Sequence, residues 1–406
     1  TVAIAGCYDR NDCFIAIRNC HTWQRRIFIL DEKSTNMVEA ITRPTQIEIS
    51  KKALKHNVAV VKQTSGADKI FLAVKSNAYG LGLVPTSKAA VAGGVYGLAV
   101  AVIDEALALR HERITEPILV LGISQAKYAE LMAVQHIMAT VVSLSWLKEA
   151  AQSLTGEQRL QVSLGVDTGM GRIGFRTRES LAQAITYLQA HKDIFDYVGL
   201  ATHFAESDSV QTDYFYMQLK RWHDITDGLP EPKYYHVANS GAAMYHADEV
   251  PHEVIRVGTV LYGVEPSRGE LADGENLQPV MSLRSEMNFV KQLPAGEGIS
   301  YSHKYTTSGD EWIGTVPIGY GDGWLRKMSG FSVIVDGQYA PIVGQVAMDQ
   351  LMIKLPHEYP VGTKVTLIGK DGDLENTLED VAQHANLAPW EIMTGMQDRV
   401  HRILVD

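Results

Sequence analysis

The sequence predicts an α/β fold, with an N-terminal (β/α)8 TIM-type barrel followed by a mainly β C-terminal domain. Short apolar runs alternate with amphipathic segments through the first part of the chain, as in strand and helix units that build a parallel sheet. Eight such runs occur, and eight strands close a barrel. After about Leu277 the pattern changes to longer alternating segments without long helices between them, which indicates a separate β domain.

The barrel strands follow from the apolar runs in chain order. Helix-like stretches lie between them, for example after Asp104, from Arg178 and from Tyr214. The predicted strands are residues 71–75, 96–101, 118–122, 139–143, 161–167, 198–203, 234–240 and 254–263. An open doubly wound sheet is the alternative that this alternation leaves open.

Domain boundaries follow from the same changes of pattern. Residues 37–276 are assigned to the barrel domain and residues 277–406 to the β domain. Within the β domain, the Asp336-Gly337 pair predicts a hairpin and Thr377 predicts the start of a short helix. Residues 1–36 have no clear period and are assigned to an extension of unknown role. An early start, with Met37 as the true first residue, is the alternative.

Composition narrows the class of protein. The chain has 406 residues, 46% hydrophobic content and a net charge of -10, which describes a globular protein and disfavours nucleic acid or an acidic membrane as a partner. No apolar run is long enough for a membrane span and no secretory signal is evident, so we expect a cytoplasmic enzyme with a small substrate. Cys7, Cys13 and Cys20 are the three thiols, in no known metal-binding pattern, and we expect no metal site.

A lysine stands at the end of the first predicted strand, in the stretch FLAVKSNAYG from Phe71 to Gly80. Apolar neighbours at the mouth of a barrel strand disfavour the charged form of an amine, and a neutral amine can form a Schiff base with an aldehyde. Lys75 therefore indicates pyridoxal phosphate (PLP) chemistry. A surface lysine that follows a strand is the alternative for this residue taken alone.

Polar residues stand at the ends of several other predicted strands. Active sites of barrel enzymes form where strands end and loops begin, so we expect these residues to converge on one rim. The set is Lys75, Tyr79, Asp167, Arg172, His203, His236, Asn239, Ser240, Arg256 and Gly258.

Eight motifs, in order along both predicted domains, resemble those of the alanine racemases, which are PLP enzymes with a (β/α)8 barrel followed by a β domain. The motifs are AVKSNAYG, VDTGMGRIGF, THFAESD, ANSGAA, IRVGTVLYG, GISYSHKY, PIGYGDGW and GQVAMDQ. They cover the chain from about Ile41 to its C-terminus. One glycine-rich motif would be weak evidence, but eight in register are specific.

The resemblance implies that Lys75 carries the cofactor and acts as one of two bases, with Tyr301 as the other. Two bases are needed because racemisation removes the α-proton from one face of a planar carbanion and returns it on the opposite face. A free phenol is a weak acid, so a phenolate base near neutral pH needs on the order of 4 kcal/mol of stabilisation. The resemblance implies that a hydrogen-bonded relay from Tyr301 through His203 to Arg256 supplies this stabilisation of the phenolate.

The resemblance also places the other residues around cofactor and substrate. Arg256 is expected against the PLP ring nitrogen, where a group that stays protonated limits charge delocalisation and discourages transamination. Arg172 is expected to contact the cofactor's phenolic oxygen and the substrate carboxylate. The backbone of Met348 would bind that carboxylate, and Tyr320 would narrow the entrance. The implied cofactor-binding set is Lys75, Tyr79, Arg172, His203, Asn239, Ser240, Arg256, Gly258 and Thr259, of which Tyr79, Ser240, Gly258 and Thr259 contact the phosphate.

The implied active site combines residues of both domains, since Tyr301 lies in the second and Lys75 in the first. In the family they meet across a head-to-tail homodimer, in which each site borrows the partner's second domain. The implied reaction interconverts L- and D-alanine, and its cellular use is D-alanine for peptidoglycan. A broader amino-acid racemase and a PLP decarboxylase of the same fold are alternatives, and Arg256 argues against the decarboxylase. A PLP-carrier protein would resemble the barrel alone.

Three positions depart from the family pattern. Many relatives have a CO2-carbamylated lysine where this chain has Gly165, so we expect a bound anion, water or another residue to hold Arg172, and activity that is insensitive to bicarbonate. A frequent cysteine before Met348 is Ala347. Asp398 stands where some members have a phosphate-contacting tyrosine, and a phosphate would repel its carboxylate, so Asp398 is excluded from the cofactor site.

Overall fold

The structure is a computed structural model that describes residues 38–272, 274 and 276–406. Residues Glu39–Asp406 form one compact unit. The predicted extension of residues 1–36, with the three cysteines, lies outside the described residues.

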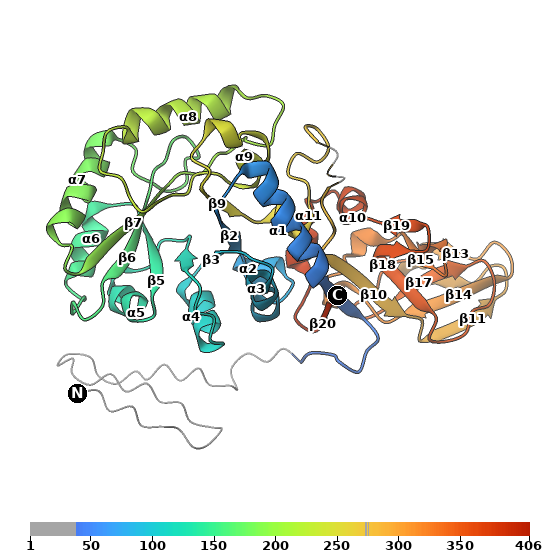
Figure 1. Ribbon diagram of the computed structural model, residues 1–406. Helices are drawn as coiled ribbons and strands as arrows, with labels where there is room; N and C mark the ends of the chain where they lie inside the picture. The colour runs from blue at the N-terminus through green and yellow to red at the C-terminus, as the bar shows by residue number, and fades with distance from the viewer. Residues whose placement is uncertain (1–37, 273, 275) are drawn as a thin grey trace, which may run out of the picture. The chain divides into compact units, whose positions relative to one another are not determined.

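A nearly closed barrel of parallel strands forms the first part of the compact unit (Figure 1). Its strands are β2 (Lys69–Ala73), β3 (Gly97–Val100), β4 (Ile118–Val120), β5 (Ile137–Val141), β6 (Leu160–Gly165), β7 (Phe195–Ala201), β8 (Tyr234–Tyr235) and β9 (Val254–Val257). β2 pairs with both β3 and β9, and the backbone N–H of Arg256 reaches the carbonyl oxygen of Ala238 at 2.9 Å beside the open seam. The predicted barrel is confirmed, and the open doubly wound sheet is not observed.

Helices surround the barrel strands (Figure 1). They are α1 (Lys51–Ser65), α2 (Lys75–Tyr79), α3 (Leu83–Ala92), α4 (Ile103–His111), α5 (Ala129–Val134), α6 (Leu144–Ala151), α7 (Arg178–Ala190), α8 (Asp213–Thr226) and α9 (Ser240–Tyr245), with 3-10 turns η1 (Ala126–Tyr128), η2 (Ala247–Glu249) and η3 (Thr259–Tyr262). Helix α7 illustrates the rule for these segments: the Thr177 side chain caps its first turn, and Leu181, Ile185 and Leu188 are buried on one face.

A second sheet carries most of the remaining chain, with strand order β11-β14-β17-β16-β15-β18-β10-β1-β20 and β19 paired to β18. Its strands are β1 (Gln46–Ser50), β10 (Met281–Glu286), β11 (Phe289–Leu293), β14 (Glu311–Val316), β15 (Ser332–Val335), β16 (Gln338–Val343), β17 (Leu351–Leu355), β18 (Lys364–Asp371), β19 (Leu374–Asn376) and β20 (His401–Val405). A separate pair comprises β12 (Gly298–Ile299) and β13 (Tyr305–Thr306). The helical segments are η4 (Tyr301–His303), η5 (Tyr320–Asp322), η6 (Arg326–Met328), α10 (Leu378–Ala385) and α11 (Pro389–Gly395).

Strand β1 falls within the range that the sequence assigned to the barrel domain, yet it belongs to this second sheet. It pairs antiparallel with β10 and parallel with β20. Ile47 and Ile49 are buried and alternate with partly exposed residues, as expected for a strand that covers a core with one face. Both predicted local features of the β domain are present. Asp336 and Gly337 turn the hairpin between β15 and β16, and Thr377 caps α10.

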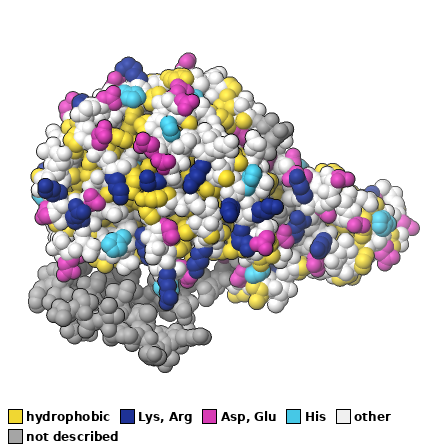
Figure 2. Space-filling view, in the orientation of Figure 1, with side chains coloured by type: hydrophobic (Ala, Val, Ile, Leu, Met, Phe, Trp, Pro, Cys, Tyr) yellow, Lys and Arg dark blue, Asp and Glu magenta, His cyan; other side chains and the backbone are white. Residues whose placement is uncertain are grey.

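Acidic and basic side chains are interspersed over the face in Figure 2. Among the residues that the structure describes, none of the helices combines the length and apolarity needed to span a membrane.

Candidate active site

Lys75 begins a turn with an unusual backbone at the end of β2. The four residues after it, Ser76 to Tyr79, all have φ between 53° and 57°. Left-handed backbone costs a non-glycine residue about 1–2 kcal/mol, so neighbouring groups must hold this turn. One of them is Glu105 at the start of α4, whose carboxylate accepts the backbone N–H groups of Ser76 and Ala101, each at 2.7 Å.

Burial, followed by the positive charge of Arg172, lowers the pKa of the Lys75 amine, and Arg256 adds to the effect while Glu105 opposes it. A lowered pKa increases the fraction of neutral amine, the form that reacts with an aldehyde or removes a proton. The direction agrees with the expectation that the surroundings of Lys75 disfavour its charge.

His203, at the end of β7, is mostly buried. Burial, with smaller effects from Arg256 and Arg172, lowers its pKa to about 3, so the ring is neutral near pH 7. Its Nδ1 is buried and has no hydrogen-bond partner among the described residues. A buried, unsatisfied ring nitrogen is costly in a protein interior, which makes this atom a candidate contact for a group that enters the site.

Arg256 contacts His236 rather than His203. Its Nη1 lies 2.8 Å from His236 Nδ1 and also donates to the His236 carbonyl oxygen, while Nη2 donates to the Thr202 carbonyl oxygen at 2.9 Å. Within the described chain, no hydrogen bond joins Arg256 to His203, so that step of the predicted relay is not present in the structure. The physical reason is that three acceptors, from the residues that directly follow β7 and β8, already occupy the guanidinium.

The His236 ring is fixed by both of its nitrogens. Its Nε2 lies 2.7 Å from Ser163 Oγ. Since an arginine can only donate, Nδ1 accepts from Arg256, and Nε2 must carry the ring proton and donate to Ser163. Burial lowers the pKa of Arg256 to about 10, which leaves it charged near pH 7. The sequence placed His236 on the rim but assigned it no role.

The residues expected at the phosphate gather around Gly258. The Gly258 backbone N–H donates to Ser240 Oγ at 3.2 Å, and a Cβ at this position would meet the hydroxyl of Tyr79. The Tyr79 ring packs on Tyr262 with centroids 4.9 Å apart, and Thr259 begins η3 directly after the glycine. These residues form one cluster of hydroxyl and backbone N–H groups.

Asn239, also expected to bind the cofactor, has its side chain occupied by structural bonds. Its Oδ1 accepts from Ser207 Oγ and from the N–H of Ala242, and its Nδ2 donates to the Phe204 carbonyl oxygen. Its structural role is to cap α9 and to join the loops after β7 and β8.

The loop that carries Arg172 is shaped by Asp167, whose Oδ1 accepts the N–H groups of Gly169 and Gly171 at 3.0 and 2.9 Å. The Arg172 side chain is exposed, and in the described part of the chain no hydrogen bond or ion pair holds its guanidinium. At Gly165, where relatives have a lysine, an added Cβ would lie 3.2 Å from Val142. Among residues 38–272, 274 and 276–406, no side chain takes the place of that lysine by bonding to Arg172.

The three second-domain residues expected at the substrate are exposed. Tyr301, Tyr320 and Met348 have 67%, 39% and 53% of their surface accessible. Tyr301 is presented on a tight turn in which Ser300 and Ser302 both have positive φ. No hydrogen bond among the described residues brings these three side chains to Lys75.

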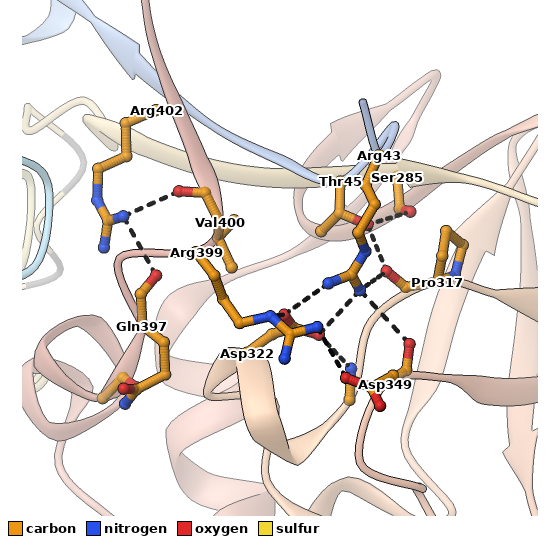
Figure 3. A network of polar contacts seen from close by, with 12 residues as sticks. Arg43, Thr45, Ser285, Pro317, Asp322, Asp349, Gln397, Arg399, Val400 and Arg402 are labelled. Atoms are coloured by element: carbon orange, nitrogen blue, oxygen red, sulfur yellow. Dashed lines mark hydrogen bonds and ion pairs between the residues drawn. The ribbon is translucent and has the colours of Figure 1, made fainter. Parts of the chain in front are cut away.

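An ionic network around one buried carboxylate holds the segments beside Tyr320 and Met348 (Figure 3). Asp322, whose side chain is fully buried, accepts from both terminal nitrogens of Arg43 at 2.9 and 3.0 Å and from Arg399 Nε at 2.9 Å. Arg399 also donates to Asp349 at 2.7 Å. Asp322 and Asp349 lie in quoted motifs, but nothing in the sequence indicated that Arg43 and Arg399 would meet them.

The residues on the barrel rim fit an anionic, aldehyde-bearing cofactor. Lys75 supplies an amine with a lowered pKa, and Arg172 and Arg256 lie close enough to influence it. His203 Nδ1 is an unsatisfied polar atom, and the Gly258 cluster supplies hydroxyl and N–H groups of the kind that bind phosphate.

Two family models match the chain: "Alanine racemase, N-terminal domain" over residues 49–266 and "Alanine racemase, C-terminal domain" over residues 280–404. The chain belongs to the alanine racemase family. It is therefore an amino-acid racemase, an isomerase, as the motifs predicted.

Close relatives of this racemase differ in the substrate that their names give. A lysine racemase from Oenococcus oeni is 53% identical over 372 residues, which covers 91% of this chain and all of the relative. A solved alanine racemase from the same species is 52% identical, covers 91% of this chain and 100% of its own, and has a TM-score of 0.87. A solved histidine racemase from Leuconostoc mesenteroides subsp. sake is 36% identical with the same coverage and TM-score.

Proposed function

We propose that this racemase interconverts L- and D-alanine with PLP bound at the barrel rim, and that the D-alanine is used for peptidoglycan. The observation that carries the proposal is the position of Lys75: an amine with a lowered pKa at the C-terminal end of a barrel strand, beside Arg172 and Arg256. This combination suits a cofactor with an aldehyde and a phosphate and a substrate with a carboxylate.

When bound, PLP supplies an aldehyde for the amine and a ring that accepts electrons from the substrate α-carbon. Lys75 would hold the cofactor, and its Nζ would take or return the α-proton on one face of the substrate. The Oη of Tyr301 would do the same on the opposite face. Arg256, whose pKa of about 10 leaves it protonated near pH 7, would favour an unprotonated ring nitrogen. Arg172 would orient the substrate carboxylate.

The site would be completed by a second copy of the chain, in a head-to-tail homodimer. Tyr301, Tyr320 and Met348 are all exposed in the single chain, although their side chains are large and hydrophobic or aromatic. A partner barrel that covers them would bury this surface and place a phenol opposite Lys75.

The test of the reaction is incubation of the PLP-loaded protein with L-alanine in deuterated water, with chirality and α-deuteration followed together. Racemisation with incorporation of one solvent deuteron is expected. Lys75→Ala should abolish both, because no amine remains to hold the cofactor or take the proton. Racemisation by Lys75→Ala at the wild-type rate would contradict the proposal.

The test of the shared site is complementation between two inactive variants. A mixture of Lys75→Ala and Tyr301→Phe chains forms some mixed dimers, each with one site that contains both intact residues. After statistical mixing, activity should recover to about one quarter of the wild-type value, because half of the dimers are mixed and each has one complete site. No recovery, with mixed dimers shown by mass spectrometry, would exclude the shared site.

A broader amino-acid racemase is the second candidate. It is favoured by a relative named lysine racemase at 53% identity and a solved histidine racemase at 36%. Comparison of kcat/KM for alanine, serine, lysine and histidine separates the two. A value for lysine at or above that for alanine would support the second candidate.

A further inference from the structure

A short stretch near the C-terminus, residues 393–402, connects the Lys75 turn to the segments that carry Tyr320 and Met348. We call residues 393–402 the connector. It runs from the end of α11 to the start of β20, and α2 and α11 lie in contact. The connector contacts the Lys75 turn on one side and the turn that carries Tyr320 on the other.

On the barrel side, the connector contacts the strained turn behind Lys75. Asn77 Nδ2 donates to Asp398 at 2.9 Å, and Asn77 Oδ1 accepts the N–H of Leu83 at 2.7 Å. Arg402 Nε donates to the Gly80 carbonyl oxygen at 2.7 Å. Gly80 has a φ of 85°, and a Cβ there would collide with the backbone of Met393. The connector thus packs directly on the turn.

On the other side, the connector contacts the turn that carries Tyr320. Arg399 Nε donates to Asp322 at 2.9 Å (Figure 3). The N–H of Gln397 donates to the Asp322 carbonyl oxygen at 3.0 Å. Gly323, with a φ of 99°, approaches the connector so closely that a Cβ would meet the carbonyl oxygen of Gly395.

The segments that carry Tyr320 and Met348 are joined to each other by backbone hydrogen bonds. The Tyr320 N–H donates to the Ala347 carbonyl oxygen at 3.1 Å, and the Gly321 N–H donates to the Met348 carbonyl oxygen at 2.8 Å. Arg399 also binds Asp349. Displacement of Arg399 would therefore move both substrate-facing segments together.

We propose that the connector is a positioning device for the racemase reaction, in which Asp398 sets the Lys75 turn through Asn77 and Arg399 sets the Tyr320 and Met348 segments through Asp322 and Asp349. These are positioning residues, since they act through other side chains. The inference rests on the proposed function, which gives Lys75, Tyr320 and Met348 their roles. In a shared-site dimer, each connector would join the lysine of one site to the substrate segments of the other.

The first test separates the role of Asp398 from that of Arg399 in the PLP-loaded homodimer. Arg399→Met should raise the KM for alanine about 5- to 10-fold with kcat changed less than about 2-fold, because it loosens groups that hold the substrate. Asp398→Ala should lower kcat about 10-fold with little change in KM, because it loosens the turn that carries Lys75. Asp398→Asn retains an oxygen that can accept from Asn77 and should restore kcat.

Lys370→Met is the matched control, because it removes a cation from an exposed ion pair in the second sheet, which also contains β20. It should leave both constants unchanged. Equal changes of kcat and KM in the two connector variants, or failure of Asp398→Asn to restore kcat while all variants melt like the wild type, would overturn the proposal.

The second test uses mixed dimers of Lys75→Ala and Tyr301→Phe chains. The complete site takes Lys75 from the Tyr301→Phe chain and the substrate segments from the Lys75→Ala chain. Arg399→Met should raise KM only when it is placed in the Lys75→Ala chain. Asp398→Ala should lower kcat only when it is placed in the Tyr301→Phe chain. The reverse assignment would overturn the proposal. If the mixed dimers show no activity, the shared site fails, and the homodimer constants still decide the role of the connector.

Discussion

The carboxylate of Asp322 receives both terminal nitrogens of Arg43, a residue 279 positions earlier in the chain. Asp322 is fully buried, whereas Arg43 and Arg399, its two cationic partners, are partly exposed. One buried acid therefore ties together the segment before β1, the turn of Tyr320 and the connector.

Asp322→Ala is expected to lower the free energy of unfolding by about 3 kcal/mol, because it leaves two guanidinium groups without their buried carboxylate. The value lies at the lower end of the range for broken buried pairs, since water can reach both arginines. Urea denaturation of the two proteins measures the difference. Asp224→Ala removes the acid of an exposed pair on α8 and should cost less than about 1 kcal/mol. Equal losses in the two variants would contradict the role of Asp322.

Acid is expected to destabilise the fold through His203 and His236. Burial holds the pKa of His203 at about 3 and that of His236 well below its usual range, so both rings are neutral in the folded chain. In the unfolded chain they take up protons near pH 6.5, so stability is complete above that pH and falls as the pH drops below it. The effect of His203 alone should lower the free energy of unfolding by about 2 kcal/mol between pH 7 and pH 5.

Urea denaturation of the cofactor-free protein at pH 7, 6 and 5 measures this dependence. His203→Gln should weaken the dependence, whereas His111→Gln, at an exposed position, should leave it unchanged. If stability is the same at pH 5 and pH 7, the neutral buried state of these histidines is wrong.

Bicarbonate is expected to have no effect on activity, because Gly165 has no side chain to carbamylate and Val142 closes the space beside it. The measurement is racemisation by CO2-depleted enzyme before and after bicarbonate is added. A clear rise in rate would mean that another amine takes over the function of the missing lysine.

Tyr301→Phe is expected to lower the racemisation rate about 100-fold or more, since the ring remains but the hydroxyl that exchanges the proton on one face is lost. Exchange of the α-proton of one enantiomer, followed by NMR in deuterated water, should persist through Lys75. Racemisation at the wild-type rate would show that the two-base assignment is wrong.

Much of this structure could be predicted from the sequence, because local chemistry determines it. The eight barrel strands follow from apolar runs, the hairpin at Asp336 from its turn residues, and the cap at Thr377 from its hydroxyl, because each signal lies within a few residues of what it specifies. The same holds for Lys75 as a candidate site residue, since it follows a buried strand in a recognisable motif.

The tertiary structure alone decided which distant segments meet. Residues 46–50 alternate as any half-buried strand does, and their pairing with β10 and β20 depends on where residues more than 200 positions away are placed. Likewise, Arg256 bonds to His236 instead of His203, Asn77 meets Asp398, and Asp322 gathers Arg43 and Arg399. Hydrogen bonds and ion pairs act over about 3 Å, so their partners are set by the packing of whole elements and not by the residue types that the sequence displays.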